Sequence, residues 1–153
     1  TAATLDEAVA DIRAATGALA RLYDQLVEHL RSELPDRLTD PVVRLRLAEL
    51  QVQIREHRTL ARRNAWIISK GGTPIAPASM AKISGSELRA QLANAAMDLL
   101  GRSGGLSAES GERAPIGGRA EFNYRLSPIF RFGGGTNEVQ RDIVAAAGLG
   151  LPR

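Results

Sequence analysis

The chain has 153 residues, of which 44% are hydrophobic and 24% charged, and its formal net charge is +3. This size and balance predict one globular domain with its own hydrophobic core. There is no cysteine, which excludes disulfides and thiolate chemistry and favours a reducing compartment such as the cytoplasm. No apolar run approaches the roughly 20 residues that a membrane-spanning helix needs. The N-terminal stretch also lacks the basic-then-apolar order of a signal peptide.

The basic balance raises the possibility of nucleic acid binding, but the distribution of charge argues against it. Arginines are interleaved with acids, and aromatic residues make up only 4%, too few for a base-stacking platform. The one basic cluster, REHRTLARR, places Arg55, Arg58, Arg62 and Arg63 mostly on one side of a helix. We interpret it as a solvated helix face, and an anionic ligand or partner is the alternative.

Two long helices are predicted in the first half of the chain. Apolar residues recur every three or four positions over 5–34, which is typical of an amphipathic helix, and Pro35 ends it. Asp40 as N-cap and Pro41 at the first helical position predict the start of the second helix. Its apolar pattern continues to Gly71–Gly72.

The second half predicts one long helix and two short elements. The long helix follows the loop GGTPIAPAS, runs from about Ser79 to Leu100, and ends at Gly101. Residues 102–120 are rich in Gly and Ser and predict little regular structure. A short helix or turn and a last short helix then flank the glycines of 133–135. No segment alternates with period two, so we predict an all-α fold: an antiparallel four-helix-type bundle of three long helices plus short C-terminal helices.

Few residues in this helical pattern indicate a catalytic or metal-binding site. The two histidines, His29 and His57, have no acidic neighbours at ligand spacing, so no metal site is predicted and both are expected at the bundle surface. The chain has neither a nucleophile-elbow serine nor a phosphate-loop lysine. A helical bundle alone says nothing about function.

The closing stretch, RFGGGTNEVQRDIVAAAGLGLPR, carries more information. Three consecutive glycines remove every side chain from a run of backbone, as a chain does where a ligand lies against it. The helix that follows opens with Thr136, Asn137 and Glu138, and its free N–H groups point back toward the glycines. A glycine-rich entry into a capped helix is the alternative.

The same stretch resembles a known family signature. GGGTNEVQRDIVAAAGLGLP is similar to the C-terminal signature of the acyl-CoA dehydrogenases, flavin enzymes that oxidise acyl thioesters. Two further segments agree in order: ASMAKISGSELRAQLANAAMDLLG resembles a helix of the family, and DPVVRLRLAELQVQIREHR resembles the preceding helix of actinobacterial members. The resemblance covers essentially the whole chain. It implies that residues 1–153 form the C-terminal helical bundle domain, without the family's N-terminal helical domain and middle β-domain.

The resemblance implies a site for FAD at the glycines. The backbone of Gly134 and Gly135 would lie flush against the cofactor, and Thr136, Asn137 and Glu138 would contact it. The helix N-terminus would face the phosphates or the adenosine part.

Three further residues match cofactor positions of the family. Arg31 corresponds to an arginine that reaches a neighbouring subunit's FAD, although the aromatic residue that usually follows is missing. Asp98 stands where a glutamine usually meets the cofactor, and an acid there would repel a pyrophosphate. Gly101 lies in the same turn, where Arg102 replaces a glycine.

The family's reaction also needs a carboxylate to take the α-proton while the flavin accepts the β-hydride. At the commoner position of that glutamate this chain has Gly134. Some branches carry the glutamate near the start of the first long helix, and counting back from Gly17 leads to Glu7, beside Asp6. Glu7 is therefore the candidate base. The alternative is an acid in the first helical turn that the helix dipole favours.

The resemblance therefore predicts part of an FAD-dependent enzyme that dehydrogenates an acyl-CoA in fatty-acid or sterol side-chain degradation. Its partners would be acyl-CoA, an electron-transfer flavoprotein-like acceptor and further subunits in a homo- or hetero-oligomer formed through the bundle, with no nucleic acid and no membrane. The isolated chain is expected to be inactive. The alternative is a non-catalytic assembly subunit of a heteromeric enzyme, and a third hypothesis is an unrelated basic helical binding domain.

Overall fold

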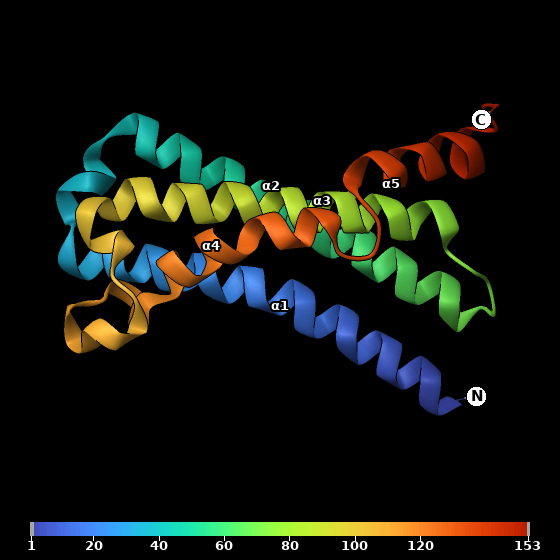
Figure 1. The fold of residues 1–153 in the computed structure, drawn as a ribbon, viewed down its shortest axis with the longest axis horizontal. Helices are drawn as coiled ribbons and strands as arrows, with labels where there is room; N and C mark the ends of the chain where they lie inside the picture. Colours follow the sequence, from blue (N-terminus) through green and yellow to red (C-terminus); the bar gives the residue numbers. More distant parts are fainter. Residues whose placement is uncertain (1, 153) are drawn as a thin grey trace.

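The computed structural model describes residues 2–152, with side chains for Ala10, Ala14 and everything from Thr16 to Pro152. Within that part of the chain every regular element is a helix or helical turn, which confirms the all-α prediction. The long helices are α1 (Ala2–Glu33), α2 (Pro41–Ser69) and α3 (Ile75–Leu100), and the shorter ones are α4 (Arg119–Phe132) and α5 (Asn137–Ile143). Figure 1 shows α1 to α4 as an antiparallel bundle from which α5 diverges.

Helix α3 lies at the centre of this arrangement. Helices α2 and α4 pack along it, α5 contacts it near the glycines, and α1 closes the bundle against α2. The N-terminal half of α1 runs away from the other helices, so the bundle opens toward the end that holds the α2–α3 loop (Figure 1). Among the described residues, no helix is both long and apolar enough to span a bilayer.

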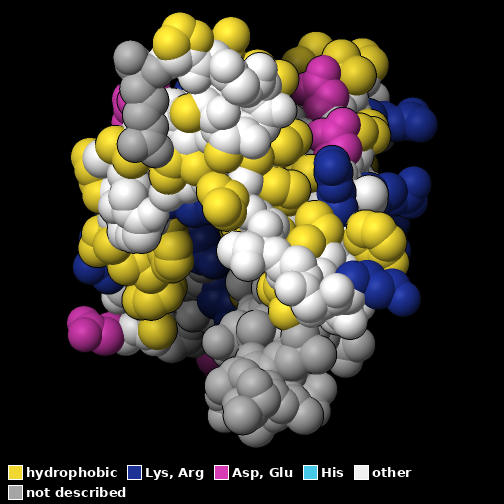
Figure 2. All heavy atoms as spheres, turned by 90° about the vertical axis from the view of Figure 1, so that its right-hand side faces the viewer, with side chains coloured by type: hydrophobic (Ala, Val, Ile, Leu, Met, Phe, Trp, Pro, Cys, Tyr) yellow, Lys and Arg dark blue, Asp and Glu magenta, His cyan; other side chains and the backbone are white. Residues whose placement is uncertain are grey.

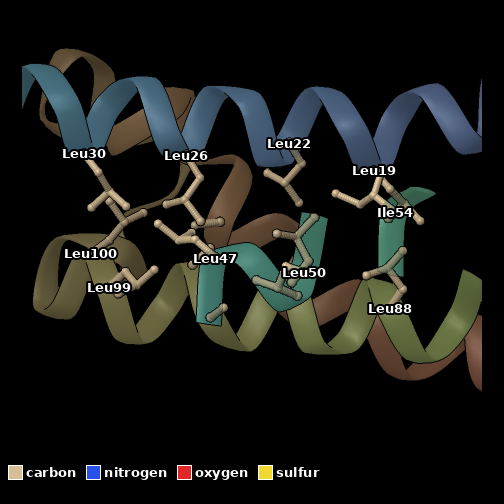
Figure 3. Close-up of a cluster of buried hydrophobic side chains, with 14 of the residues drawn as sticks. Leu19, Leu22, Leu26, Leu30, Leu47, Leu50, Ile54, Leu88, Leu99 and Leu100 are labelled. Atoms are coloured by element: carbon tan, nitrogen blue, oxygen red, sulfur yellow. The ribbon is translucent and has the colours of Figure 1, made fainter. Parts of the chain in front are cut away.

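The core consists mainly of leucines and isoleucine from the three long helices (Figure 3). Leu26, Leu30 and Leu92 are fully buried, and burying each such side chain stabilises the fold by about 1.5–3 kcal/mol. The residues that meet at this centre are Leu19, Leu22, Leu26 and Leu30 of α1, Leu47, Leu50 and Ile54 of α2, and Leu88, Leu99 and Leu100 of α3.

The predicted helix boundaries are confirmed for α1 and α2. Helix α1 ends at Glu33, and Pro35 opens a short 3₁₀ turn, η1 (Pro35–Thr39). The Asp40 carboxylate accepts a hydrogen bond of 2.8 Å from the Val42 N–H, so it caps α2 as predicted. At the far end Gly71 has a φ of +77°, the left-handed conformation that glycine adopts at helix ends.

The predicted start of α3 was wrong by four residues, because the helix begins at Ile75 rather than Ser79. Two prolines caused the error. Pro74 immediately precedes the helix, and Pro77 lies in its first turn, where the missing N–H has no intrahelical partner to lose.

The region predicted to have little regular structure folds as a chain of 3₁₀ turns. They are η2 (Gly101–Gly105), η3 (Ala108–Arg113) and η4 (Pro115–Gly118). Gly118 has a φ of +72°, and a Cβ there would lie 2.3 Å from the Ala108 backbone nitrogen. The glycines in this region therefore serve tight backbone packing.

The prediction that both histidines lie at the surface was wrong for His57. Its side chain is only 8% exposed and lies against Gly85 of α3. A Cβ on Gly85 would come within 2.7 Å of the imidazole Cε1, so the missing side chain makes room for the ring. His29 is half-buried. Within the described residues, no group of three or more His, Cys, Asp or Glu side chains could hold a metal ion.

Candidate functional site

The glycine loop, Gly133–Thr136, connects α4 to α5. Gly134 and Gly135 have φ values of +72° and +91°, a region that other residues enter only at a cost. The Gln140 side-chain amide donates a 2.7 Å hydrogen bond to the Gly134 carbonyl and holds the turn closed. A Cβ on Gly135 would lie 2.9 Å from that amide nitrogen, whereas a Cβ on Gly134 would meet nothing within 4 Å. The loop therefore needs glycine for its own conformation, and Gly134 additionally leaves its backbone open.

The first turn of α5 is capped by its own side chains. The Thr136 hydroxyl accepts a 3.3 Å hydrogen bond from the Val139 N–H. The exposed Glu138 carboxylate accepts hydrogen bonds from its own backbone N–H and from the Thr136 hydroxyl, and both lower the pKa of that carboxyl. A phosphate at this helix end would have to displace the carboxylate.

Asn137 points inward rather than toward solvent. It is only 1% exposed. Its carbonyl oxygen accepts hydrogen bonds from Lys82 Nζ at 2.7 Å and Ser86 Oγ at 3.0 Å. Its amide nitrogen donates to Glu87 Oε1 at 3.3 Å. The Asn137 side chain thus fixes the loop to α3.

Lys82, Ser86 and Glu87, which we call the α3 clamp, hold the glycine loop on both sides. Besides Asn137 after the loop, Lys82 Nζ donates to the Arg131 carbonyl before it, at 3.0 Å. Glu87 also accepts a hydrogen bond from Arg141 of α5. Burial lowers the pKa of the Lys82 ammonium. The sequence reasoning missed this clamp, although the spacing of Lys82 and Ser86 places them on one helix face, a signal it could have used.

A cavity of about 240 Å³ lies beneath the loop. Gly133, Lys82, Arg89 and Phe130 contribute to its wall. The Arg89 guanidinium lies 4.1 Å from the centre of the Phe130 ring, and burial lowers its pKa. Figure 2, viewed toward this end of the bundle, shows Lys and Arg side chains deep in a hollow between hydrophobic ones.

The other predicted cofactor residues lie at the opposite end of α3. From Glu87 to Asp98 the helix advances three turns, or about 16 Å. Asp98 pairs with Arg46 at 2.8 Å, which offsets much of the repulsion that its carboxylate would exert on a phosphate. Gly101 ends α3 with a φ of +60°. Arg31, at the end of α1, is exposed and lies 3.7 Å from Glu28.

The structure therefore brings the predicted site residues together as two groups rather than one. Gly134 to Glu138 form the first group, at the glycine loop. Arg31, Asp98 and Gly101 belong to the second, at the far end of the bundle. The candidate base, Glu7, lies within α1, but its side chain is outside the described residues.

The bundle and its glycine loop define a helical domain with an open backbone site at one end. The chain belongs to the acyl-CoA dehydrogenase family: the family model described as acyl-CoA dehydrogenase, C-terminal domain, matches residues 4–149. A curated relative, "Acyl-CoA dehydrogenase FadE26" of Mycobacterium tuberculosis (strain ATCC 25618 / H37Rv), is 45% identical over 82 residues, which are 54% of this chain and 20% of the relative.

Solved structures agree with this assignment. The "Tcur3481-Tcur3483 steroid ACAD" is 30% identical with a TM-score of 0.84, over 93% of this chain and 36% of that one. The ChsE4-ChsE5 complex from Mycobacterium tuberculosis is also 30% identical, with a TM-score of 0.79 over 90% and 36% of the two chains. The "FAD complex of PigA" is 25% identical, with a TM-score of 0.71 over 90% and 34%. This chain spans about a third of the length of these structures.

Proposed function

We propose that this chain is the C-terminal domain of an FAD-dependent acyl-CoA dehydrogenase, which forms an α,β double bond in an acyl-CoA thioester. The family match over nearly the whole chain supports the reaction class. The observation that carries the proposal is the glycine loop, whose open backbone at Gly134 is held in place by the α3 clamp.

The residues at the loop fit a flat cofactor. An ideal Cβ at Gly134 would meet no atom within 4 Å, so a ring system has access to this backbone, and Gln140 keeps the loop in shape. We propose that the backbone of Gly134 and Gly135 and the side chains of Thr136 and Glu138 hold FAD, while Asn137 contributes only its backbone. FAD, when bound, supplies the acceptor for the substrate's β-hydride. The relative named as an FAD complex supports this cofactor.

The second group of residues supports an oligomer. Arg31, Gly101 and the Asp98–Arg46 pair lie about 16 Å or more along the bundle from the α3 clamp, so we propose that they approach the FAD of a neighbouring subunit. The relative described as a ChsE4-ChsE5 complex supports assembly with a second chain. An electron-transfer flavoprotein-like protein remains our proposal for the electron acceptor.

We propose a bulky, sterol-derived acyl group rather than a simple fatty acyl group as the substrate. The support is the likeness to the structure named as a steroid ACAD, at 30% identity. The other outcome of a substrate screen would be a preference for unbranched acyl chains.

For the base we propose Glu7, because Gly134 has no side chain to take the α-proton. A glutamate at Gly134 would also have to adopt the φ of +72° found there, which is strained for any residue other than glycine. The carboxylate of Glu7 would accept the α-proton, and the amide of a glutamine could bind in its place but not take the proton.

The test is Glu7→Gln in the assembled enzyme, with the exposed Glu33→Gln on the same helix as matched control. We expect turnover to fall by about 10²–10⁴-fold in Glu7→Gln, which is typical for loss of a positioned base, while FAD and acyl-CoA still bind. The control should keep full turnover. Unchanged turnover in Glu7→Gln would favour the second candidate function, a non-catalytic assembly subunit, to which the missing glutamate at Gly134 already points.

A further inference from the structure

Two buried polar atoms of α2 have no hydrogen-bond partner in the described part of the chain. They are His57 Nδ1 and Asn64 Oδ1. Their side chains are 8% and 5% exposed. The two residues are seven positions apart, so they lie on one face of α2, two turns or about 10 Å from each other. Buried polar groups without partners destabilise a fold, and they are rare unless a water or ligand completes them.

Both residues line a second cavity, of about 310 Å³, between α2 and α3. Apart from Lys82 and Thr16, the rest of its wall is apolar and comes from Ala61, Ile68, Pro74, Ala78 and Ala81. His57, Ala81 and Lys82 also line the 240 Å³ cavity beneath the glycine loop, so the two cavities adjoin.

The adjoining cavities, which we call the α3 channel, follow α3 from Ala78 to Arg89, a length of about 16 Å. One end lies at Gly133 of the glycine loop, and the other lies beside Asn64. A molecule that occupies both cavities would therefore reach from the glycine loop, past Lys82 and His57, to Asn64.

The channel's chemistry defines what fits. The wall of the cavity beside Asn64 is mainly apolar and favours an apolar body, and the amide oxygen of Asn64 can only accept a hydrogen bond, so the ligand must donate one. A hydroxyl meets this requirement and, because it also accepts, would satisfy the Asn64 amide in either orientation. Neutral His57, about 10 Å away along α2, presents a nitrogen that a second hydroxyl or a water can bond.

We propose that the α3 channel binds an apolar group that carries a hydroxyl, and that Asn64 recognises the hydroxyl. This inference rests on the proposed function, in which the hydroxylated group is the end of the acyl substituent farthest from the thioester. Asn64 would then select hydroxylated acyl groups over equally bulky ones that lack a donor.

The test uses two probes, 4-cyclohexylphenol and its methyl ether, of which only the phenol has a hydrogen-bond donor. Calorimetry on the purified protein should show that the phenol binds at least about tenfold more tightly, because only the phenol supplies the missing hydrogen bond. Asn64→Leu should abolish this preference. Asn94→Leu, an exposed asparagine of α3, should keep it.

Each other outcome contradicts the proposal. Equal binding of the two probes would mean that the channel is merely apolar, and no binding of either would mean that water fills it. A preference that survives in Asn64→Leu would place the donor's partner elsewhere. Should Asn64→Leu fail to fold by circular dichroism, Asn64→Ala replaces it. The binding measurement needs no turnover. It can therefore support the α3 channel in a protein without dehydrogenase activity, and it can contradict the channel in an active dehydrogenase.

Discussion

At the scale of single residues, the glycine loop is organised by a side chain that points into the bundle. Asn137 is buried and makes three hydrogen bonds to the α3 clamp. The resemblance assigns this position to the cofactor. The structure adds a physical reason, because an apolar residue here would leave the partly buried Lys82 ammonium and the buried Ser86 hydroxyl with fewer partners.

His57 shows what residue-by-residue reading of the sequence can miss. A histidine with no acid at ligand spacing was expected at the surface, yet it continues the buried stripe of α2 after Leu50 and Ile54. The three-and-four spacing of that stripe would have predicted its burial. No sequence pattern marks Gly85 as its neighbour, because that contact arises only when α2 and α3 pack together.

The burial of His57 predicts a pH-dependent stability. Burial lowers its pKa below the usual 6.5, so the unfolded chain takes up a proton at a pH where the folded chain does not. The free energy of unfolding should therefore be unaffected by this group above pH 6.5 and fall as the pH drops below it, by up to about 1.4 kcal/mol per pH unit, until the folded pKa is reached.

Urea unfolding of the wild type and His57→Gln between pH 7.5 and pH 5 measures this effect. The difference in pH slope between the two proteins isolates His57. The exposed Asn94→Gln on α3, which removes no titrating group, is the control and should keep the wild-type slope. Parallel slopes for wild type and His57→Gln would contradict the prediction.

At the scale of elements, hydrophobic periodicity predicted the helices well, and capping residues predicted the ends of α1 and α2. The start of α3 was missed because a proline in a first helical turn looks like a loop signal. The 3₁₀ turns between Gly101 and Gly118 could not be predicted from the sequence. Their glycines are required by tertiary contacts, such as the close approach of Gly118 to the Ala108 backbone.

The packing of α2 on α3 predicts an unusual response to Gly85→Ala. In an open helix this change stabilises by about 1 kcal/mol. Here the new Cβ would lie 2.7 Å from His57 Cε1, so the buried ring must move and we expect a loss of about 1–3 kcal/mol.

A double-mutant cycle with His57→Ala identifies the cause. In the His57→Ala background Gly85→Ala should become neutral or stabilising, as measured by denaturant unfolding. If Gly85→Ala costs the same in both backgrounds, the contact between His57 and Gly85 is not what disfavours a side chain there.

At the scale of the whole molecule, the bundle leaves large apolar side chains on its outer faces. Val42, Leu45, Val52 and Trp66 on α2 are all more than half exposed, and Phe132 on α4 is 67% exposed. The four α2 residues follow a spacing of three, seven and fourteen, which places them along one stripe. Extended apolar surface of this kind usually marks an interface.

We therefore expect the protein to associate through α2. Sedimentation at tens of micromolar should show an oligomer, and Trp66→Glu should shift it toward the monomer because a carboxylate would be buried without a partner. Glu49→Gln, an exposed change on the same helix, should not. A monomer in the wild type would remove the basis for an interface on this stripe.

The family and the position of the glycine loop could be predicted from the sequence. The spatial separation of the candidate site residues into two groups could not. Thr136 caps α5 as its residue type predicts, and the order of motifs led to the family that the comparisons show. The separation of Asp98 from the loop, the neutralising partner Arg46 and the α3 channel all depend on tertiary contacts between distant segments.

The measurement that tests the central proposal most directly is an anaerobic titration of the assembled, full-length protein with a sterol-derived acyl-CoA. We predict that the protein purifies yellow and that the substrate bleaches its visible flavin absorbance, as the flavin is reduced while the acyl group gains its double bond. A protein that purifies colourless and takes up no FAD, or a yellow one that no acyl-CoA bleaches, would contradict the assignment of this domain to a working dehydrogenase.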